Sequence, residues 1–180
     1  MIISDIENAN LCRLDTSRKA VEPCSIVIFG ASGDLTARKL IPALYHLFKE
    51  QQLPPDFRIV GFARREKTDE SFRAELREAL DRFSRTKPVE DATWNDFAKH
   101  IVYCMGDLTD RAAYKKLEQQ LAAFNSPALR NNLLFYLAIS PSQFGDAVEN
   151  LDNAGLLRPP GETGWQRIVV EKPFGHDLAS

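Results

Sequence analysis

The fold is decided by residues 25–35, which read Ser25-Ile26-Val27-Ile28-Phe29-Gly30-Ala31-Ser32-Gly33-Asp34-Leu35. The first five residues form a short β-rich run, and such a run is typical of a strand that is buried on both faces. From residue 35 to residue 49, apolar residues recur at helical spacing. A strand, a glycine turn and a helix therefore follow one another directly, which is how a βαβ unit begins.

The rest of the chain alternates between the same two patterns. Apolar runs predict strands at residues 25–29, 58–63, 133–138 and 167–171, and another strand that begins at residue 101. Periodic apolar residues predict helices at residues 35–49, 69–83, 94–99, 111–124 and 142–154. Alternating strands and helices build parallel sheets with right-handed crossovers. We therefore expect an α/β protein with a Rossmann-like doubly wound parallel sheet at residues 24–180, after a flexible N-terminal extension at residues 1–23.

The composition is that of an ordinary globular domain. Of 180 residues, 44% are hydrophobic and 27% are charged, and the formal net charge is -2, so nothing favours a nucleic-acid-binding protein. No apolar stretch approaches the ~20 residues of a membrane span, and the N-terminus lacks the basic and apolar segments of a signal peptide. The three cysteines have no metal-binding spacing, so we expect no metal site and a reducing, cytoplasmic location.

The turn at residues 30–35 joins the first predicted strand to the first predicted helix. Glycine lets a backbone approach a pyrophosphate closely, and free N–H groups at a helix start face the negative charge. Ser32 and Thr36 can add hydroxyl donors. The spacing is neither the standard G-x-G-x-x-G nor a Walker loop. The pattern indicates a dinucleotide phosphate site, and the alternative is a plain strand-to-helix turn with Asp34 near the helix N-terminus.

The second predicted strand ends in Phe62-Ala63-Arg64-Arg65. Enzymes that use NAD usually place a carboxylate at this point, where it binds the ribose 2′-hydroxyl. A guanidinium pairs instead with a 2′-phosphate, in a charge-assisted contact worth on the order of 1.5–3 kcal/mol. The sequence therefore predicts NADP as the coenzyme, with Arg64 on its 2′-phosphate. The alternative is a solvated basic corner that pairs with Glu66, Asp69 or Glu70.

A second polar motif, Glu171-Lys172-Pro173, directly follows the last predicted strand. Open α/β sheets bind ligands in the crevice beyond the carboxyl ends of their strands, and charges are costly to hold beside a core. A lysine at this place can position a sugar hydroxyl and stabilise developing negative charge. The alternative is a salt bridge between Lys172 and Glu171. The chain stops soon after the motif, so we expect this chain to contain only part of the site.

Four motifs in this order resemble the glucose-6-phosphate dehydrogenase family: residues 30–40 (Gly-Ala-Ser-Gly-Asp-Leu-Thr-Ala-Arg-Lys-Leu), 61–64 (Gly-Phe-Ala-Arg), 134–141 (Leu-Phe-Tyr-Leu-Ala-Ile-Ser-Pro) and 171–175 (Glu-Lys-Pro-Phe-Gly). The resemblance implies an NADP-dependent dehydrogenase that acts on a CH–OH group. Its reaction would be the oxidation of glucose 6-phosphate to 6-phosphogluconolactone, the first step of the oxidative pentose phosphate pathway. It also implies that the family's C-terminal α+β domain is missing from this chain. We therefore expect a homo-oligomeric parent enzyme and no turnover by this chain alone.

The resemblance assigns roles to residues of this sequence. The residues that would contact the coenzyme phosphates are Gly30, Ser32, Gly33, Asp34 and Leu35. Arg64 would contact the 2′-phosphate, and Ala138 and Pro141 would border the nicotinamide end. Lys172 would position the substrate sugar and, with Pro173, border the coenzyme, while Lys39 would project toward the substrate. The family's catalytic histidine lies in an Asp-His-Tyr motif that does not occur here. Leu108 replaces an aromatic residue that stacks on adenine in some relatives.

Other residues resemble catalytic groups but lie in unsuitable places. His176-Asp177 follows a glycine and is more typical of a helix start that the aspartate caps. Tyr45 and Lys49 match the Tyr-x-x-x-Lys pair of short-chain dehydrogenases, yet they fall on the first predicted helix. Two other functions stay open at this point. The chain could be a complete small NADP-dependent reductase, or a non-enzymatic module that senses the NADP/NADPH ratio.

Overall fold

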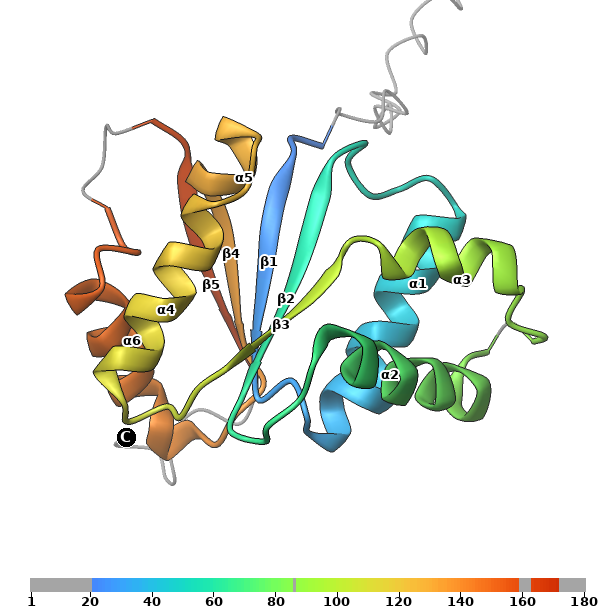
Figure 1. Ribbon diagram of the computed structural model, residues 1–180, viewed down its shortest axis with the longest axis horizontal. Helices are drawn as coiled ribbons and strands as arrows, with labels where there is room; N and C mark the ends of the chain where they lie inside the picture. Colours follow the sequence, from blue (N-terminus) through green and yellow to red (C-terminus); the bar gives the residue numbers. More distant parts are fainter. Residues whose placement is uncertain (1–20, 86, 159–162, 172–180) are drawn as a thin grey trace, which may run out of the picture.

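The computed structural model describes residues 21–85, 87–158 and 163–171. Within these ranges five parallel strands form one sheet in the order β3-β2-β1-β4-β5 (Figure 1). The strands are β1 (Cys24–Phe29), β2 (Phe57–Ala63), β3 (Ile101–Met105), β4 (Asn132–Leu137) and β5 (Trp165–Val170). Every predicted strand is confirmed, with ends that differ by no more than two residues.

Helices cover both faces of the sheet, which confirms the Rossmann-like doubly wound prediction (Figure 1). One face carries α1 (Ile41–Lys49), α2 (Asp69–Phe83) and α3 (Asp91–Ala98), and the other carries α4 (Arg111–Ala122), α5 (Pro127–Asn131) and α6 (Phe144–Asn153). The bounds of α2 are the predicted ones, and the Thr68 side chain caps this helix by accepting the Ser71 N–H. The short helix α5 was not predicted, because its five residues are too few to show a periodic pattern.

The central strand β1 is buried on both faces, which accounts for its continuous apolar sequence. Ile26 and Ile28 belong to the core beneath α1, α2 and α3, whereas Val27 and Phe29 belong to the core beneath α4 and α6. All six residues of the strand are buried. The sheet therefore fixes the position of the turn that begins directly after Phe29.

The first predicted helix begins within one residue of the expected start, but the hydrogen bonding of its first turns differs. Residues Thr36–Leu40 form a π-helical turn in which the Ile41 N–H donates to the Thr36 carbonyl, and regular α-helix begins at Ile41. Pro42 explains the wider turn, because proline has no N–H for the carbonyl four residues earlier and its ring crowds that carbonyl. The glycine turn therefore leads into a bulge before α1 begins.

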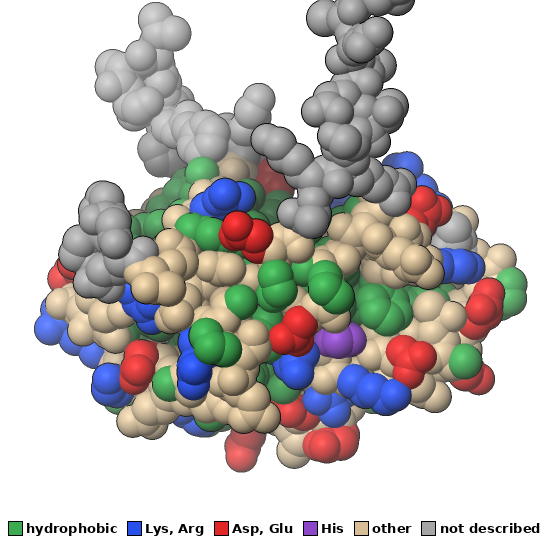
Figure 2. All heavy atoms as spheres, turned by 90° about the horizontal axis from the view of Figure 1, so that it is seen from above, with side chains coloured by type: hydrophobic (Ala, Val, Ile, Leu, Met, Phe, Trp, Pro, Cys, Tyr) green, Lys and Arg blue, Asp and Glu red, His purple; other side chains and the backbone are tan. Residues whose placement is uncertain are grey.

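Neither a broad patch of one charge on the face seen in Figure 2 nor a membrane-spanning helix is found among the described residues. On the face seen in Figure 2, acidic and basic side chains are interspersed, and no broad area has one sign. None of the helices in the described ranges combines the length and the apolar character needed to cross a membrane. Residues 1–20 lie outside the described ranges, so the predicted N-terminal extension stays a prediction.

Candidate coenzyme site

A groove of about 610 Å³ lies at the carboxyl edge of the sheet. Its lining comes from the ends of β1, β2, β3 and β4 and from the segments that follow them: Gly30, Ser32, Gly33, Phe62, Ala63, Arg64, Arg65, Gly106, Asp107, Leu108, Thr109, Ala138, Ile139 and Gln143. In the sheet, β1 lies between β2 and β4, so the strand order reverses here. Open α/β sheets bind ligands at such a reversal. The groove is therefore the candidate site of the fold.

Gly30 brings the glycine turn against the end of β4. Its φ of 77° lies in the left-handed region, which glycine adopts without the steric cost that other residues incur. A Cβ atom at this position would lie 2.3 Å from the carbonyl oxygen of Ala138. The close approach that lets both segments line one groove therefore requires glycine.

The hydrogen bonds of the turn correct one part of the prediction. The N–H groups of Gly30 and Ala31 both donate to the Phe62 carbonyl, at 3.0 and 3.2 Å, and the Gly33 N–H donates to the Gly30 carbonyl at 2.8 Å. The hydroxyl of the buried Thr36 also donates to the Gly30 carbonyl, at 3.2 Å. These donors hold the turn together and do not point at a ligand. Of the two hydroxyls expected to bind phosphate, the one on the groove is that of Ser32.

Two residues assigned to the coenzyme phosphates, Asp34 and Leu35, are absent from the lining of the groove. Asp34 is exposed, and its carboxylate pairs with Arg38 one turn farther along, at 3.2 Å. Leu35 is half-buried. The placement of Asp34 agrees with the plainer alternative, in which it lies near the start of the helix. A phosphate contact by either residue stays a prediction.

Arg64 lies on the groove directly after β2, where the sequence predicts it. Its Nε atom is 3.9 Å from an oxygen of Asp107, and its side chain is 80% exposed. Among the ion pairs of the described residues, Arg64 pairs with this aspartate rather than with Glu66, Asp69 or Glu70. The observed ion pair therefore differs from those of the alternative interpretation, because it joins Arg64 to the segment after β3.

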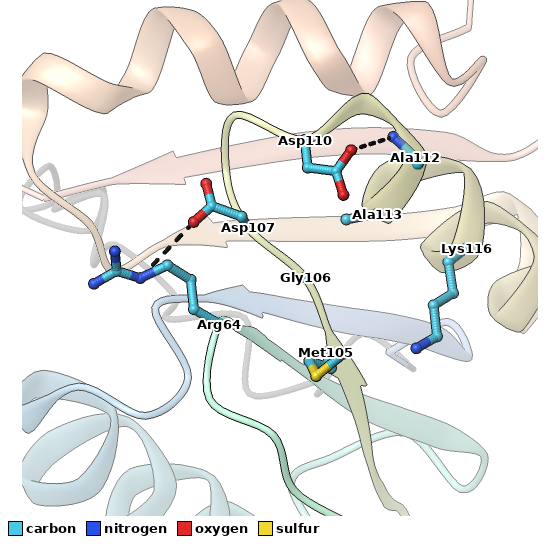
Figure 3. Close-up of a pocket in the computed structure, with 8 residues that line it drawn as sticks. All are labelled: Arg64, Met105, Gly106, Asp107, Asp110, Ala112, Ala113 and Lys116. Carbon is cyan, nitrogen blue, oxygen red and sulfur yellow. Dashed lines mark hydrogen bonds and ion pairs between the residues drawn. The ribbon is translucent and has the colours of Figure 1, made fainter.

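A hollow of about 350 Å³ lies beside the groove and shares Arg64, Gly106 and Asp107 with it. Figure 3 shows the ion pair between Arg64 and Asp107 on one side of the residues that line the hollow, and Lys116 of α4 on the other side. Asp110 lies above, and its carboxylate caps α4 by accepting the Ala112 N–H at 2.9 Å. The hollow is therefore lined by two cations, Arg64 and Lys116, and by two carboxylates, Asp107 and Asp110.

The other end of the groove is formed by the segment after β4. Ala138, Ile139 and Gln143 line it. The Ala138 N–H donates to the Phe29 carbonyl at 3.0 Å, which ties this segment to the end of β1. Pro141 begins the 3-10 turn Pro141–Gln143 and is exposed. Of the two residues assigned to the nicotinamide end, Ala138 is on the groove and Pro141 is absent from its lining.

Of the two lysines assigned to the substrate, only Lys39 lies within the described residues. Lys39 lines a separate pocket of about 450 Å³ between α1 and the end of α2, together with Arg38, Phe83 and Arg85. Lys172, like Pro173, lies outside the described residues. Glu171, directly before it, accepts a hydrogen bond from the Tyr136 hydroxyl. Substrate contacts by Lys39 and Lys172 stay predictions.

Within the described residues, neither Tyr45 nor a histidine lines the groove. Tyr45 is buried in the core, edge-on to Phe97. His46 is exposed on α1, and His100 precedes β3, where burial lowers its pKa. His176 lies outside the described residues. Within the described ranges, no cluster of three or more histidine, cysteine, aspartate or glutamate side chains could hold a metal ion.

Sequence reasoning missed three lining residues after β3, namely Gly106, Asp107 and Thr109. A Cβ atom on Gly106 would lie 2.4 Å from the ring of Phe62, so the chain at this point lies directly against β2. The sequence feature that could have identified these residues is the pair Gly106-Asp107, which directly follows an apolar run. Leu108, where an aromatic residue occurs in some relatives, does lie on the groove.

Comparison with known proteins agrees with this geometry. Residues 27–180 match a family model described as "Glucose-6-phosphate dehydrogenase, NAD binding domain". Curated glucose-6-phosphate 1-dehydrogenases of Chlamydia pneumoniae and Bacillus subtilis are 42% and 37% identical to the chain, over 167 and 156 residues. These alignments cover 91% and 86% of this chain, but only 32% and 30% of those proteins. The chain thus spans about a third of the length of these relatives.

Solved structures give the same result. A structure of glucose-6-phosphate dehydrogenase in complex with its substrate glucose-6-phosphate matches with a TM-score of 0.77 and 36% identity, over 88% of this chain and 32% of that one. Glucose-6-phosphate 1-dehydrogenase from Mycobacterium avium matches with a TM-score of 0.73 and 33% identity, over the same shares of the two chains. Because the family model covers most of its length, the chain belongs to the glucose-6-phosphate dehydrogenase family.

Proposed function

We propose that this chain is the coenzyme-binding part of an NADP-dependent glucose-6-phosphate dehydrogenase, which oxidises glucose 6-phosphate to 6-phosphogluconolactone in the pentose phosphate pathway. The observation that carries the proposal is the groove itself. It lies where the strand order reverses, and it has Arg64 at the end of β2, where enzymes that use NAD usually carry a carboxylate. Membership of the family supports the reaction.

The residues of the groove fit a dinucleotide along its length. At Gly30, the space that a Cβ atom would take is filled by the Ala138 carbonyl, so the glycine turn and the segment after β4 lie close together along the groove. Ser32 and Gly33 line the groove, where the Ser32 hydroxyl would meet a phosphate, and Arg64 lies at one end to meet the 2′-phosphate. Ala138 lies at the other end, beside the place proposed for the nicotinamide.

The bound coenzyme would accept a hydride from C1 of the sugar at C4 of its nicotinamide ring. The chain's own contribution is to hold the coenzyme, and to position the substrate through Lys172 and Lys39. A base must also remove the proton of the C1 hydroxyl, and the family's histidine for this role has no counterpart in this sequence. We therefore propose that this chain alone has no turnover, and that its parent is a cytoplasmic homo-oligomer.

The proposal is tested by titrating the chain with NADP and with NAD in a calorimeter, before and after Arg64→Ala. Loss of a charge-assisted contact of on the order of 1.5–3 kcal/mol predicts NADP binding about tenfold to a hundredfold weaker, with NAD binding nearly unchanged. Arg111→Ala is the control, because Arg111 is exposed, pairs with Glu149 at 3.3 Å and does not line the groove. Equal losses for both coenzymes would contradict the role of Arg64.

A turnover assay separates the proposal from its two alternatives. The chain is mixed with glucose 6-phosphate or with carbonyl substrates, and NADPH is followed by its absorbance. Reduction of a carbonyl substrate by this chain alone would favour the complete small reductase. Turnover of glucose 6-phosphate by a longer protein that contains this chain would support the dehydrogenase. NADP binding without turnover by any longer protein would favour the sensing module.

A further inference from the structure

The ion pair between Arg64 and Asp107 joins two segments that are distant in sequence and adjacent in space. Strands β2 and β3 are neighbours, and their register pairs Ala63 with Met105. The residues that follow these two positions therefore leave the sheet side by side. This places a carboxylate 3.9 Å from the cation that the proposed function assigns to the 2′-phosphate.

The two members of the pair are held very differently. The Asp107 carboxylate accepts the N–H of Thr109 at 2.9 Å and its hydroxyl at 2.8 Å. Its side chain is 43% exposed, whereas that of Arg64 is 80% exposed. The bonds from Thr109, together with the charge of Arg64, hold the pKa of Asp107 below its usual value. Asp107 is thus an ionised group held in the turn by Thr109, and Arg64 is an exposed side chain that reaches it.

A 2′-phosphate that approached Arg64 would therefore meet a negative charge already in place. The phosphate would share the guanidinium with Asp107, which lies 3.9 Å from its Nε atom, and it would bind beside a carboxylate of the same sign. A ribose 2′-hydroxyl has neither cost, because it carries no charge and can donate a hydrogen bond to a carboxylate. Lys116 and Asp110 line the adjacent hollow and add one charge of each sign.

We propose that Asp107 is a specificity-determining residue, which competes with the coenzyme 2′-phosphate for Arg64 and so limits the preference of this site for NADP over NAD. The inference rests on the proposed function, since it presupposes that the groove binds a dinucleotide. It goes beyond that function because it assigns the discrimination to two residues of opposite charge, one after each of two neighbouring strands. Exposed ion pairs are worth about 0.2–1 kcal/mol, so release of the pair changes binding by up to about fivefold.

The test is Asp107→Asn, with NADP and NAD each titrated calorimetrically at low salt. The asparagine side-chain oxygen can still accept from Thr109, so the turn is kept and only the charge is removed. We expect the ratio of the NAD to the NADP dissociation constant to rise about twofold to fivefold. The rise should shrink at high salt, because salt screens exposed charges. Asp107→Ser is a second uncharged variant, whose hydroxyl can also accept from the turn.

Asp96→Asn is the matched control, because it makes the same charge change on α3, where Asp96 pairs with Lys99 at 2.7 Å. The ratio should not change in this variant. An unchanged or lower ratio in both Asp107 variants would overturn the inference. Equal weakening of both coenzymes would overturn it as well, because Asp107 would then act only on the shape of the loop. Failure of the parent chain to bind either coenzyme would refute the proposed coenzyme site itself.

Discussion

Replacing Gly30 with alanine tests the central geometric feature of the groove. The residue has a φ of 77°, and its new Cβ atom would lie 2.3 Å from the Ala138 carbonyl oxygen. Such a distance is shorter than any normal contact, and the atom it meets belongs to the backbone. The turn must therefore move away from the end of β4, and the two sides of the groove must separate.

The cost can be worked from two contributions. An L-residue in the left-handed region costs about 1–2 kcal/mol. Movement of the turn also weakens the 3.0 Å hydrogen bond from the Gly30 N–H to the Phe62 carbonyl, and such a bond contributes about 0.5–1.5 kcal/mol. We therefore expect Gly30→Ala to lower the free energy of unfolding by about 1.5–3.5 kcal/mol and to abolish measurable NADP binding.

The assay is urea unfolding followed by circular dichroism, combined with an NADP titration of the folded variant. With a urea dependence of about 2 kcal/mol per molar, the midpoint should fall by about 1–2 M. Gly145→Ala is the matched control, since no heavy atom lies within 4 Å of its new Cβ atom, at the start of α6. This variant should gain about 0.5–1 kcal/mol, because alanine favours a helix more than glycine does.

Two results would refute the reasoning. If Gly30→Ala unfolded at the same urea concentration as the parent, the left-handed turn and its contact with Ala138 would not exist as described. If the variant lost stability but bound NADP with unchanged affinity, the glycine turn would form part of the fold without forming part of the coenzyme site.

Two further predictions concern Cys104, within β3, and Gly106, directly after it. Gly106→Ala should lower the free energy of unfolding by about 1–3 kcal/mol through overpacking, because its Cβ atom would lie 2.4 Å from the Phe62 ring; an unchanged denaturation midpoint would contradict this contact. Burial raises the pKa of the Cys104 thiol from 9.0 to about 11, so its contribution to stability is present below pH 9 and is lost as the pH rises toward 11. Cys104→Ala should remove that part of the loss of stability at alkaline pH, as measured by thermal unfolding between pH 8 and pH 11. An identical dependence of stability on pH in both proteins would show that this thiol is not shielded from solvent.

The sequence predicted the fold well because the buried strands are continuous apolar runs and the helices are amphipathic. It did not predict the π-helical turn before α1, since a single Pro42 changes the hydrogen bonding without disturbing the apolar spacing. It did not predict α5, which has only five residues. These differences are local, and the order of strands and helices is unaffected by them.

The site was predicted in part. The glycine turn and Arg64 were found because each directly follows a predicted strand, and the carboxyl ends of parallel strands meet at one edge. The position of Asp107 depends on which strands are neighbours and in what register, and the linear sequence does not state either. The internal hydrogen bonds of the turn were also unforeseen, because they depend on the left-handed conformation of Gly30 and on the burial of Thr36.

The most direct test of the account is to map NADP on this chain by NMR, through the shifts of backbone amide signals during a titration. The account predicts that the largest shifts fall at Ser32, Arg64, Asp107 and Ala138, which line one groove. It also predicts little change at Lys39 and Phe83, in the separate pocket between α1 and α2. Shifts confined to that second pocket, or no shifts at saturating NADP, would contradict the assignment of the groove as the coenzyme site.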